Sequence, residues 1–177
     1  MIYRNLALGL GLAALTACTS AEITTPPVII TAKVPANAVG VDVYARDRQR
    51  GNPVPRFRGQ HTVQVRSFAN TDNGRSELSG VPCSLDSGLF SATFATPANV
   101  VVPDYGPASP ALFVRCTADD KSGSITVSAF NYSAQQRTNG AGSTGILGAI
   151  IITAVAAANR NDETDEFRYP PLIVNLR

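Results

Sequence analysis

The chain has 177 residues, a formal net charge of +2 at pH 7, one histidine and no tryptophan. So small a net charge gives no strong field for recruiting nucleic acid, and a single histidine excludes metal sites built from several histidines. Valine, serine and threonine are plentiful, and 14 glycines and 12 prolines punctuate the chain. This composition predicts an all-β domain made of short strands and many turns.

The N-terminal residues follow the order of a bacterial lipoprotein signal. Arg4 supplies positive charge, residues 6–15 form an apolar run too short to span a bilayer, and small residues precede Cys18. We expect cleavage of the signal peptide, residues 1–17, and lipidation of Cys18, whose acyl chains, palmitate among them, anchor the protein in a membrane. The alternatives are an ordinary membrane anchor and a secretory signal with a chance cysteine.

Residue 19 indicates in which membrane such a lipoprotein is located. In enteric bacteria an aspartate directly after the lipidated cysteine is a signal for retention in the inner membrane, and Thr19 stands here instead. We therefore expect the outer membrane, on its periplasmic face.

Removal of 17 residues from the 177 leaves 160, which suffices for one domain with a single core. Residues 18–37 are rich in serine, threonine, alanine and proline, and this composition predicts an extended tether. The apolar residues 28–30 within it also fit an edge strand. We expect a single β domain over residues 38–177.

Two cysteines remain once Cys18 carries lipid. Cys83 and Cys116 lie in strand-like runs, and in an oxidising periplasm we expect them to form a disulfide that ties two strands across the core. A closed loop of about 33 residues corresponds to roughly 3.5–4 kcal/mol of stability. A redox or metal-binding pair would need the CxxC spacing or a nearby histidine, which these cysteines lack.

Alternating apolar residues predict most of the strands. The first two are expected at residues 39–43 and 62–68, followed by a turn at residues 71–80. A denser series of short strands then follows, with turn residues between them, at residues 81–85, 89–94, 100–102, 112–118 and 124–130. Short strands with this spacing are typical of a β-sandwich or a partly open barrel.

Five arginines are concentrated between the first two predicted strands: Arg46, Arg48, Arg50, Arg56 and Arg58. Guanidinium groups match the geometry of phosphates and carboxylates, so one interpretation is a loop that binds an anionic envelope component. The other is a solvated hairpin loop kinked by its two prolines.

A second unusual segment is the Gly-rich apolar insertion at residues 139–158. It carries no charge, but its apolar part, residues 146–158, is shorter than the roughly 20 residues that a spanning helix needs. Three interpretations stay open: a short helix or strand of the core, a contact with a partner or a second copy, and insertion into a membrane. The acidic residues 162–166 that follow predict a solvated turn.

Three strings in the second half of the chain are similar to those of a known group of proteins. They are GVPCSL at residues 80–85, TPANVVVP at 96–103 and LFVRCTAD at 112–119, followed by YPPLIVNL at 169–176. In this order they resemble uncharacterised proteobacterial lipoproteins with a PEGA-like β domain, over roughly residues 79–177. The resemblance implies a small Ig-like or PEGA-like β-sandwich without known catalysis. This chain departs from the pattern of those lipoproteins at residues 119–121, where it has Asp-Asp-Lys in place of their basic Gly-Tyr.

The sequence contains no motif typical of an enzyme, such as GxSxG, a phosphate-binding glycine loop or HExxH. His61 is expected to be a packing or surface residue. We predict no catalytic activity, no cofactor and no metal. The leading hypothesis is a structural or adaptor module that docks on an envelope protein or a second copy. A glycan- or lipopolysaccharide-binding module using the arginines is the alternative, and an enzyme or enzyme inhibitor is a third.

Overall fold

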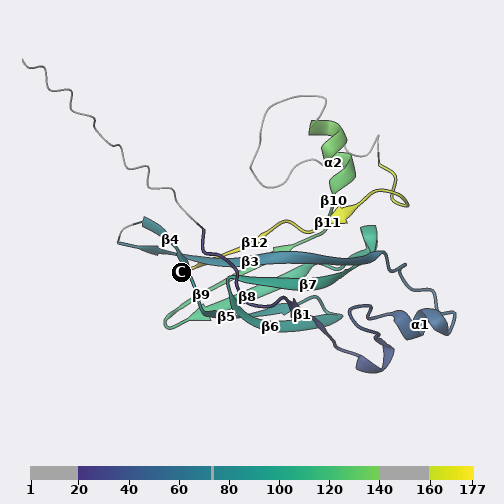
Figure 1. Ribbon diagram of the computed structural model, residues 1–177, viewed down its shortest axis with the longest axis horizontal. Coiled ribbons are helices and arrows are strands. Elements are labelled where there is room, and N and C mark those ends of the chain that lie inside the picture. The colour runs from purple at the N-terminus through teal and green to yellow at the C-terminus, as the bar shows by residue number, and fades with distance from the viewer. Residues whose placement is uncertain (1–19, 73, 140–159) are drawn as a thin grey trace, which may run out of the picture.

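The computed structural model describes residues 20–72, 74–139 and 160–177, which form a sandwich of two five-stranded sheets (Figure 1). This confirms the predicted all-β class. Sheet A has the order β1-β7-β3-β12, with β4 also paired to β3, and sheet B has the order β2-β6-β5-β8-β9. The strands of sheet A are β1 (Val28–Ile29), β3 (Gly59–Thr71), β4 (Gly74–Leu78), β7 (Ala98–Asp104) and β12 (Leu172–Leu176). Those of sheet B are β2 (Thr31–Ala32), β5 (Val81–Asp86), β6 (Phe90–Thr96), β8 (Leu112–Ala118) and β9 (Lys121–Val127).

The period-2 pattern of the sequence is the reason these strands form. In β3, Val63, Val65, Ser67 and Ala69 are buried between the sheets, and the residues that alternate with them face outward. Strand β8 has the bounds that the sequence predicts, and its inward residues are fully buried. The core is therefore a continuous layer of mostly valine and leucine between the two sheets.

Both sides of the sandwich are nearly closed. On one side the chain passes directly from β1 in sheet A to β2 in sheet B through the buried Ile30. On the other side the edge strands β9 and β12 meet, where Ser122 and Arg177 exchange two backbone hydrogen bonds of 3.1 Å. A Cβ at Gly123 would lie 2.2 Å from the Asn175 carbonyl oxygen, so only glycine permits this approach. Few strand edges are left free to pair with other chains.

The edge-strand interpretation of residues 28–30 is confirmed for Val28 and Ile29, which pair in parallel with β7. Thr31 and Ala32 continue the chain into sheet B as β2. The part of the predicted tether from Val28 onward therefore belongs to the sandwich.

Two local predictions are wrong. Residues 39–43 form a turn rather than a strand, because Gly40 has a φ of +59° and Val39 pairs with Asp42 in an isolated bridge. Val41, Asp42 and Val43 are all buried, so the alternation in the sequence does not reflect two faces. The turn predicted at residues 71–80 contains β4, whose polar side chains hide its strand character.

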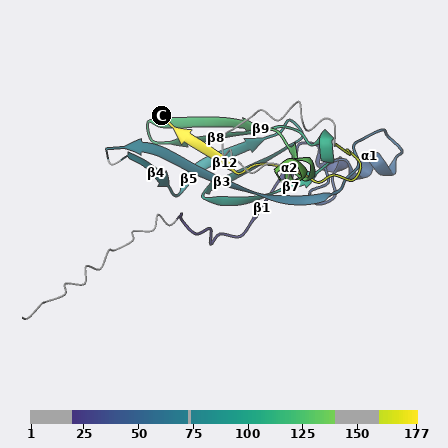
Figure 2. The same cartoon turned by 90° about the horizontal axis from the view of Figure 1, so that it is seen from above.

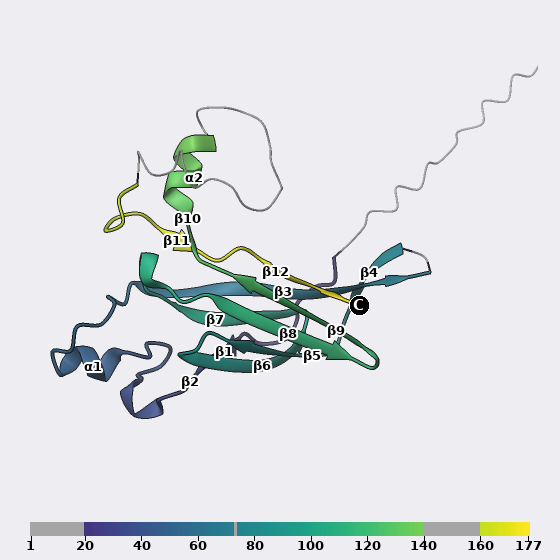
Figure 3. The same cartoon turned by 180° about the vertical axis from the view of Figure 1, so that it is seen from behind.

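The arginine segment is not a hairpin loop. It begins with the short helix α1 (Ala45–Gln49) and then runs without regular structure into β3. A 3₁₀ turn, η1 (Pro35–Asn37), precedes it, and a second one, η2 (Gly106–Ala108), follows β7. Together they form the end of the sandwich at which α1 lies in Figure 3.

A small appendage stands beside sheet A, seen at the top of Figure 3. It contains the two-stranded pairing of β10 (Phe130–Asn131) with β11 (Phe167–Arg168) and the helix α2 (Tyr132–Asn139). The Gly-rich segment lies, from residue 140 onward, outside the described residues, and its three interpretations stay predictions. Within the described residues no helix is both long and apolar enough to cross a membrane.

Candidate functional site

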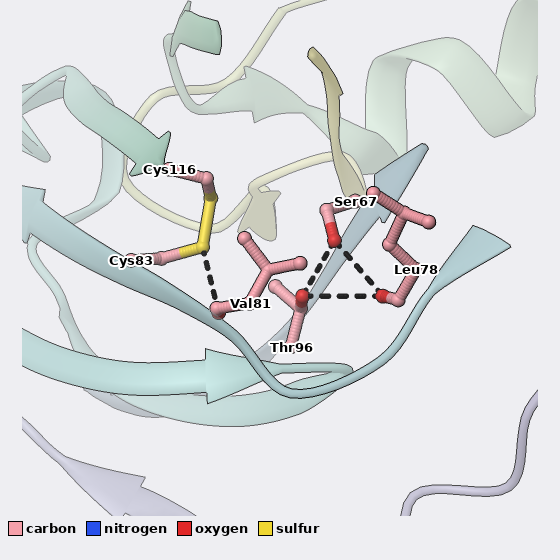
Figure 4. The surroundings of a disulfide bond; sticks show 6 residues. All are labelled: Ser67, Leu78, Val81, Cys83, Thr96 and Cys116. Carbon is pink, nitrogen blue, oxygen red and sulfur yellow. Dashed lines mark hydrogen bonds between the residues drawn. A yellow bond between two sulfur atoms is a disulfide. The ribbon is translucent and has the colours of Figure 1, made fainter. Parts of the chain in front are cut away.

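The predicted disulfide between Cys83 and Cys116 is present (Figure 4). The two cysteines are direct partners in the antiparallel register of β5 and β8, so the bond joins neighbouring strands of sheet B rather than crossing the core. Their exposed fractions are 6% and 0%. Next to the bond in Figure 4, the buried hydroxyls of Ser67 and Thr96 lie 2.6 Å apart and close a polar contact between the two sheets.

Arg48, the second of the five arginines, is part of a half-buried network. Its Nη1 lies 2.7 Å from Asp42 Oδ2, and its Nη2 donates to the Pro55 carbonyl oxygen at 2.7 Å. The other oxygen of Asp42 accepts a hydrogen bond from the Tyr105 hydroxyl at 3.0 Å, and that hydroxyl also accepts one from the Val43 amide. Burial raises the pKa of Tyr105 far above its ordinary value, so its hydroxyl stays protonated and donates to Asp42. Arg48 therefore ties α1 to the turn before it and to Pro55, and Tyr105 joins that turn to the end of β7.

Two more of the arginines bind within the chain. Arg50 Nη1 donates to Asn37 Oδ1 at 3.3 Å and contacts Asp47 at 3.4 Å. Arg58 donates to the carbonyl oxygens of Asp162 and Asp165, the latter at 3.1 Å.

The guanidinium of Arg58 also fills the space beside Gly106, where an added Cβ would lie 2.4 Å from its Cζ. Arg46 and Arg56 are exposed, and within the described residues no hydrogen bond or ion pair engages either side chain. The structure thus separates the five arginines instead of gathering them into one anion site.

This separation predicts different effects for individual arginines. Replacing Arg48 with Gln leaves the buried Asp42 carboxylate without its cation, and we expect a loss of about 1–3 kcal/mol in the free energy of unfolding. Replacing the exposed Arg56 with Gln is the matched control and should change stability by less than about 0.5 kcal/mol. Urea unfolding of the two variants measures both effects, and equal losses would contradict the assignment of Arg48 to a structural network.

His61 lies near the start of β3 and faces the buried carboxylate of Asp104. Its Nε2 lies 3.2 Å from Asp104 Oδ2, close enough for an ion pair, although the ring is not aligned for a linear hydrogen bond. The contact with Asp104 raises the pKa of His61 above its ordinary value, against the effect of burial. Burial alone would raise the pKa of Asp104, but His61, the Gly106 amide and the charge of Arg58 together lower it.

A small open cavity of about 190 Å³ borders this pair, lined by His61, Thr62, Val63, Glu166, Arg168 and Tyr169. Small-molecule sites usually occupy roughly 300–1,000 Å³. The volume is therefore small for a substrate pocket, and the ion pair is best explained as a contact between β3 and β7.

The ion pair predicts a pH dependence of stability. A raised pKa of His61 stabilises the fold fully below the unfolded value of about 6.5, and this contribution is lost as the pH rises through the folded pKa. A lowered pKa of Asp104 stabilises above about pH 3.9 and is lost as the pH falls. We expect the unfolding free energy of the wild type to fall between about pH 6 and 8 by more than that of His61→Gln. Parallel pH profiles of the two proteins would contradict this.

Asp165 joins the appendage to the turn at residues 160–166. Its Oδ2 accepts hydrogen bonds from Asn131 Nδ2 at 2.7 Å and from the Asn161 amide at 2.8 Å. Arg137 binds both carboxylate oxygens, at 2.9 and 2.8 Å. Arg137 and then Asn131 hold the pKa of Asp165 well below its ordinary range. The prediction that residues 162–166 form a solvated turn is wrong at Asp165, which is 5% exposed.

The backbone on either side strengthens the same junction. The Tyr132 amide donates to the Glu166 carbonyl oxygen at 2.9 Å, and the Glu166 amide donates to Ser133 Oγ at 2.9 Å. The start of α2 and the chain that returns after residue 160 are therefore fixed against each other.

We expect Asp165→Asn to loosen this junction, because an amide cannot accept the bidentate contact of Arg137. The variant should be cleaved faster by protease within residues 160–166 at neutral pH, and Glu163→Gln, an exposed change in the same turn, should not. Because the pKa of Asp165 is lowered, the advantage of the wild type begins to decline below about pH 3.9 and is lost only as the pH falls through the lower folded pKa. Equal cleavage of both variants would show that Asp165 does not hold the turn.

Sequence reasoning missed these acidic partners. Asp42 and Asp104 lie within predicted strands or beside them, and Asp165 lies in an acidic run, so neither hydropathy nor spacing marks them as buried. One available signal is Gly106 directly after Asp104 and Tyr105, because an aspartate two residues before an amide often closes a turn. Asp104 does accept a hydrogen bond from the Gly106 amide at 2.7 Å.

Cys18 lies outside the described residues, so its predicted lipidation stays a prediction. Among residues 20–72, 74–139 and 160–177, no group of three or more histidine, cysteine or acidic side chains is arranged to hold a metal ion. No family model, no curated protein and no solved structure matches this chain. The resemblance to proteobacterial lipoproteins with a PEGA-like domain therefore also stays a prediction.

Proposed function

We propose that the protein is a lipid-anchored component of the cell envelope whose disulfide-bonded sandwich is a structural or adaptor module. The observation that carries this proposal is that charged side chains of the domain hold its loops in place. Arg48, Arg58 and Asp165 each fix a loop through buried or backbone partners. Loops fixed in this way lose little conformational entropy when a partner binds. The lipoprotein signal that precedes the domain supports the anchoring.

The partner that we propose is an envelope protein or a second copy of the chain. Exposed apolar residues around η1 support this, since Val34 and Val39 are each 56% exposed. They lie close to α1 in the sequence, and the exposed Arg46 of that helix adds a charge suited to the polar rim of an interface.

Site-specific photo-crosslinking in intact cells tests the adaptor role. A photoreactive residue at Val39 should give an adduct of one discrete mass, whereas the same residue at Ser84, exposed on sheet B, serves as the control. An adduct with a second copy or with one other envelope protein supports the proposal. The proposal is contradicted if Val39 gives no discrete adduct, or if both positions give the same mixture of adducts of many masses.

A further inference from the structure

Ala21, which follows Cys18 closely in the sequence, is held on the outer face of sheet A. The Ala21 amide donates to Glu77 Oε2 at 3.2 Å, and the Ala21 carbonyl oxygen accepts from Arg66 Nη1 at 2.9 Å. Arg66 and Glu77 also form an ion pair of 2.6 Å with exposed fractions of 15% and 14%. We call this arrangement the arm clamp. In Figure 2 the arm that leads from Ala21 to β1, drawn in purple, lies outside the layer that contains β3 and β4.

The arm clamp changes the expected distance between the domain and its anchor. Two residues, Thr19 and Ser20, lie between Cys18 and Ala21, so the three Cα–Cα steps that join them reach at most about 10 Å when fully extended. The headgroup region of one leaflet is roughly 5–8 Å thick. A lipidated Cys18 thus brings the clamp to the membrane surface, whereas a free tether would let the domain stand off.

The clamp also decides which face of the sandwich is turned to the membrane. Packed sheets lie about 10 Å apart, so sheet B and its outer side chains lie beyond the reach of a two-residue link from the outer face of sheet A.

The composition of that outer face fits a phospholipid surface. Ile29 is 63% exposed and Ile173 is 40% exposed, and register places Ile173 beside Arg66. The guanidinium of Arg75 lies 4.2 Å from the centre of the Phe68 ring, on the same face. Exposed isoleucines near the exposed Arg75, whose stem is apolar and whose guanidinium can bind phosphate, are suited to a headgroup layer.

We propose that the outer face of sheet A rests on the phospholipid surface that holds Cys18, and that the arm clamp fixes this orientation. The inference rests on the proposed lipidation of Cys18. It turns the outer face of sheet B and its exposed Phe113 away from the membrane.

The absence of tryptophan from the chain makes a direct test available. Ile173→Trp on sheet A and Phe113→Trp on sheet B are matched probes, because the native side chains are 40% and 42% exposed in outward positions of strands. The full lipidated protein is reconstituted in vesicles of phosphatidylethanolamine and phosphatidylglycerol that contain brominated lipid, which quenches nearby tryptophan. We expect several-fold stronger quenching for Ile173→Trp than for Phe113→Trp.

Clamp variants complete the experiment. Arg66→Ala with Glu77→Ala in the Ile173→Trp background should reduce the quenching toward that of the sheet B probe. Lys33→Ala with Asp86→Ala removes an ion pair of 2.8 Å that does not touch the arm, and it should leave the quenching unchanged.

The outcomes separate the inference from the proposed function. Equal quenching of the two probes, or none from either, in protein that stays bound to the vesicles overturns the orientation and leaves the lipid anchor intact. Protein that carries no lipid and does not bind vesicles overturns the anchor, and the orientation with it.

Discussion

Replacing Cys83 and Cys116 together with alanine is expected to lower the free energy of unfolding by about 3.5–4 kcal/mol. The bond closes a loop with a sequence separation of 33 residues, and its loss lets the unfolded chain occupy many more conformations. The native structure changes little, because the backbone hydrogen bonds of β5 and β8 hold the two strands in register without the bond. The effect therefore arises mainly in the unfolded state.

Urea unfolding measures this prediction in two ways. The midpoint should fall, and the dependence on urea should steepen, because an uncrosslinked chain exposes more surface when it unfolds. Ser84→Ala with Arg115→Ala is the matched control, since these residues are the adjacent pair in the same register but face solvent. The control should lose less than about 1 kcal/mol. A double alanine variant with the stability of the wild type would contradict the prediction.

The strands and the disulfide are the parts of the fold that the sequence predicts well. The dense strands from Val81 to Val127 show strong alternation and are separated by turn residues, so both signals agree. The cysteine pairing follows from an even count in the predicted compartment. It could not be predicted that the two cysteines are neighbours in one sheet, because strand order depends on contacts between residues far apart in the chain.

The failures at residues 39–43 and at Asp165 share one physical cause, which is a tertiary contact that overrides a local pattern. Val41 and Val43 alternate as in a strand, but the Tyr105 hydroxyl and Arg48 bind Asp42 between them and stabilise a turn. Asp165 lies in a run that looks solvated, yet Arg137 from the other side of the Gly-rich segment buries it. No single-sequence signal reports such partners.

The arginine segment shows the same limit for the candidate site. Five arginines within 13 residues suggest shared recognition of an anion. Each guanidinium that is engaged within the described residues finds a different partner, and the segment is divided between α1 and the approach to β3. The sequence thus indicates that positive charge is concentrated in this segment. Which partner each arginine binds depends on where the folded backbone places its side chain.

Replacing Cys18 with Ser is expected to abolish membrane attachment of the proposed lipoprotein. A serine hydroxyl cannot take the thioether-linked lipid, so the precursor should stay unprocessed or the protein should appear in the soluble fraction. Each buried methylene of an acyl chain contributes about 0.8 kcal/mol, and the loss of all chains removes the whole anchoring free energy. Fractionation together with incorporation of a labelled fatty acid measures the effect.

The fold itself should survive this change, because residues 20–72, 74–139 and 160–177 form the sandwich and its Cys83–Cys116 bond without Cys18. The soluble variant is therefore expected to unfold at the same urea concentration as the domain of the wild type. Thr19→Asp is the matched control, since it keeps the lipidated cysteine and should move the protein from the outer to the inner membrane of an enteric host. Unchanged membrane attachment of Cys18→Ser, with no fatty acid label on the wild type, would mean that residues 1–17 act as an ordinary anchor. In that case the arm clamp would hold the sandwich against the end of an uncleaved N-terminal anchor instead of a lipid.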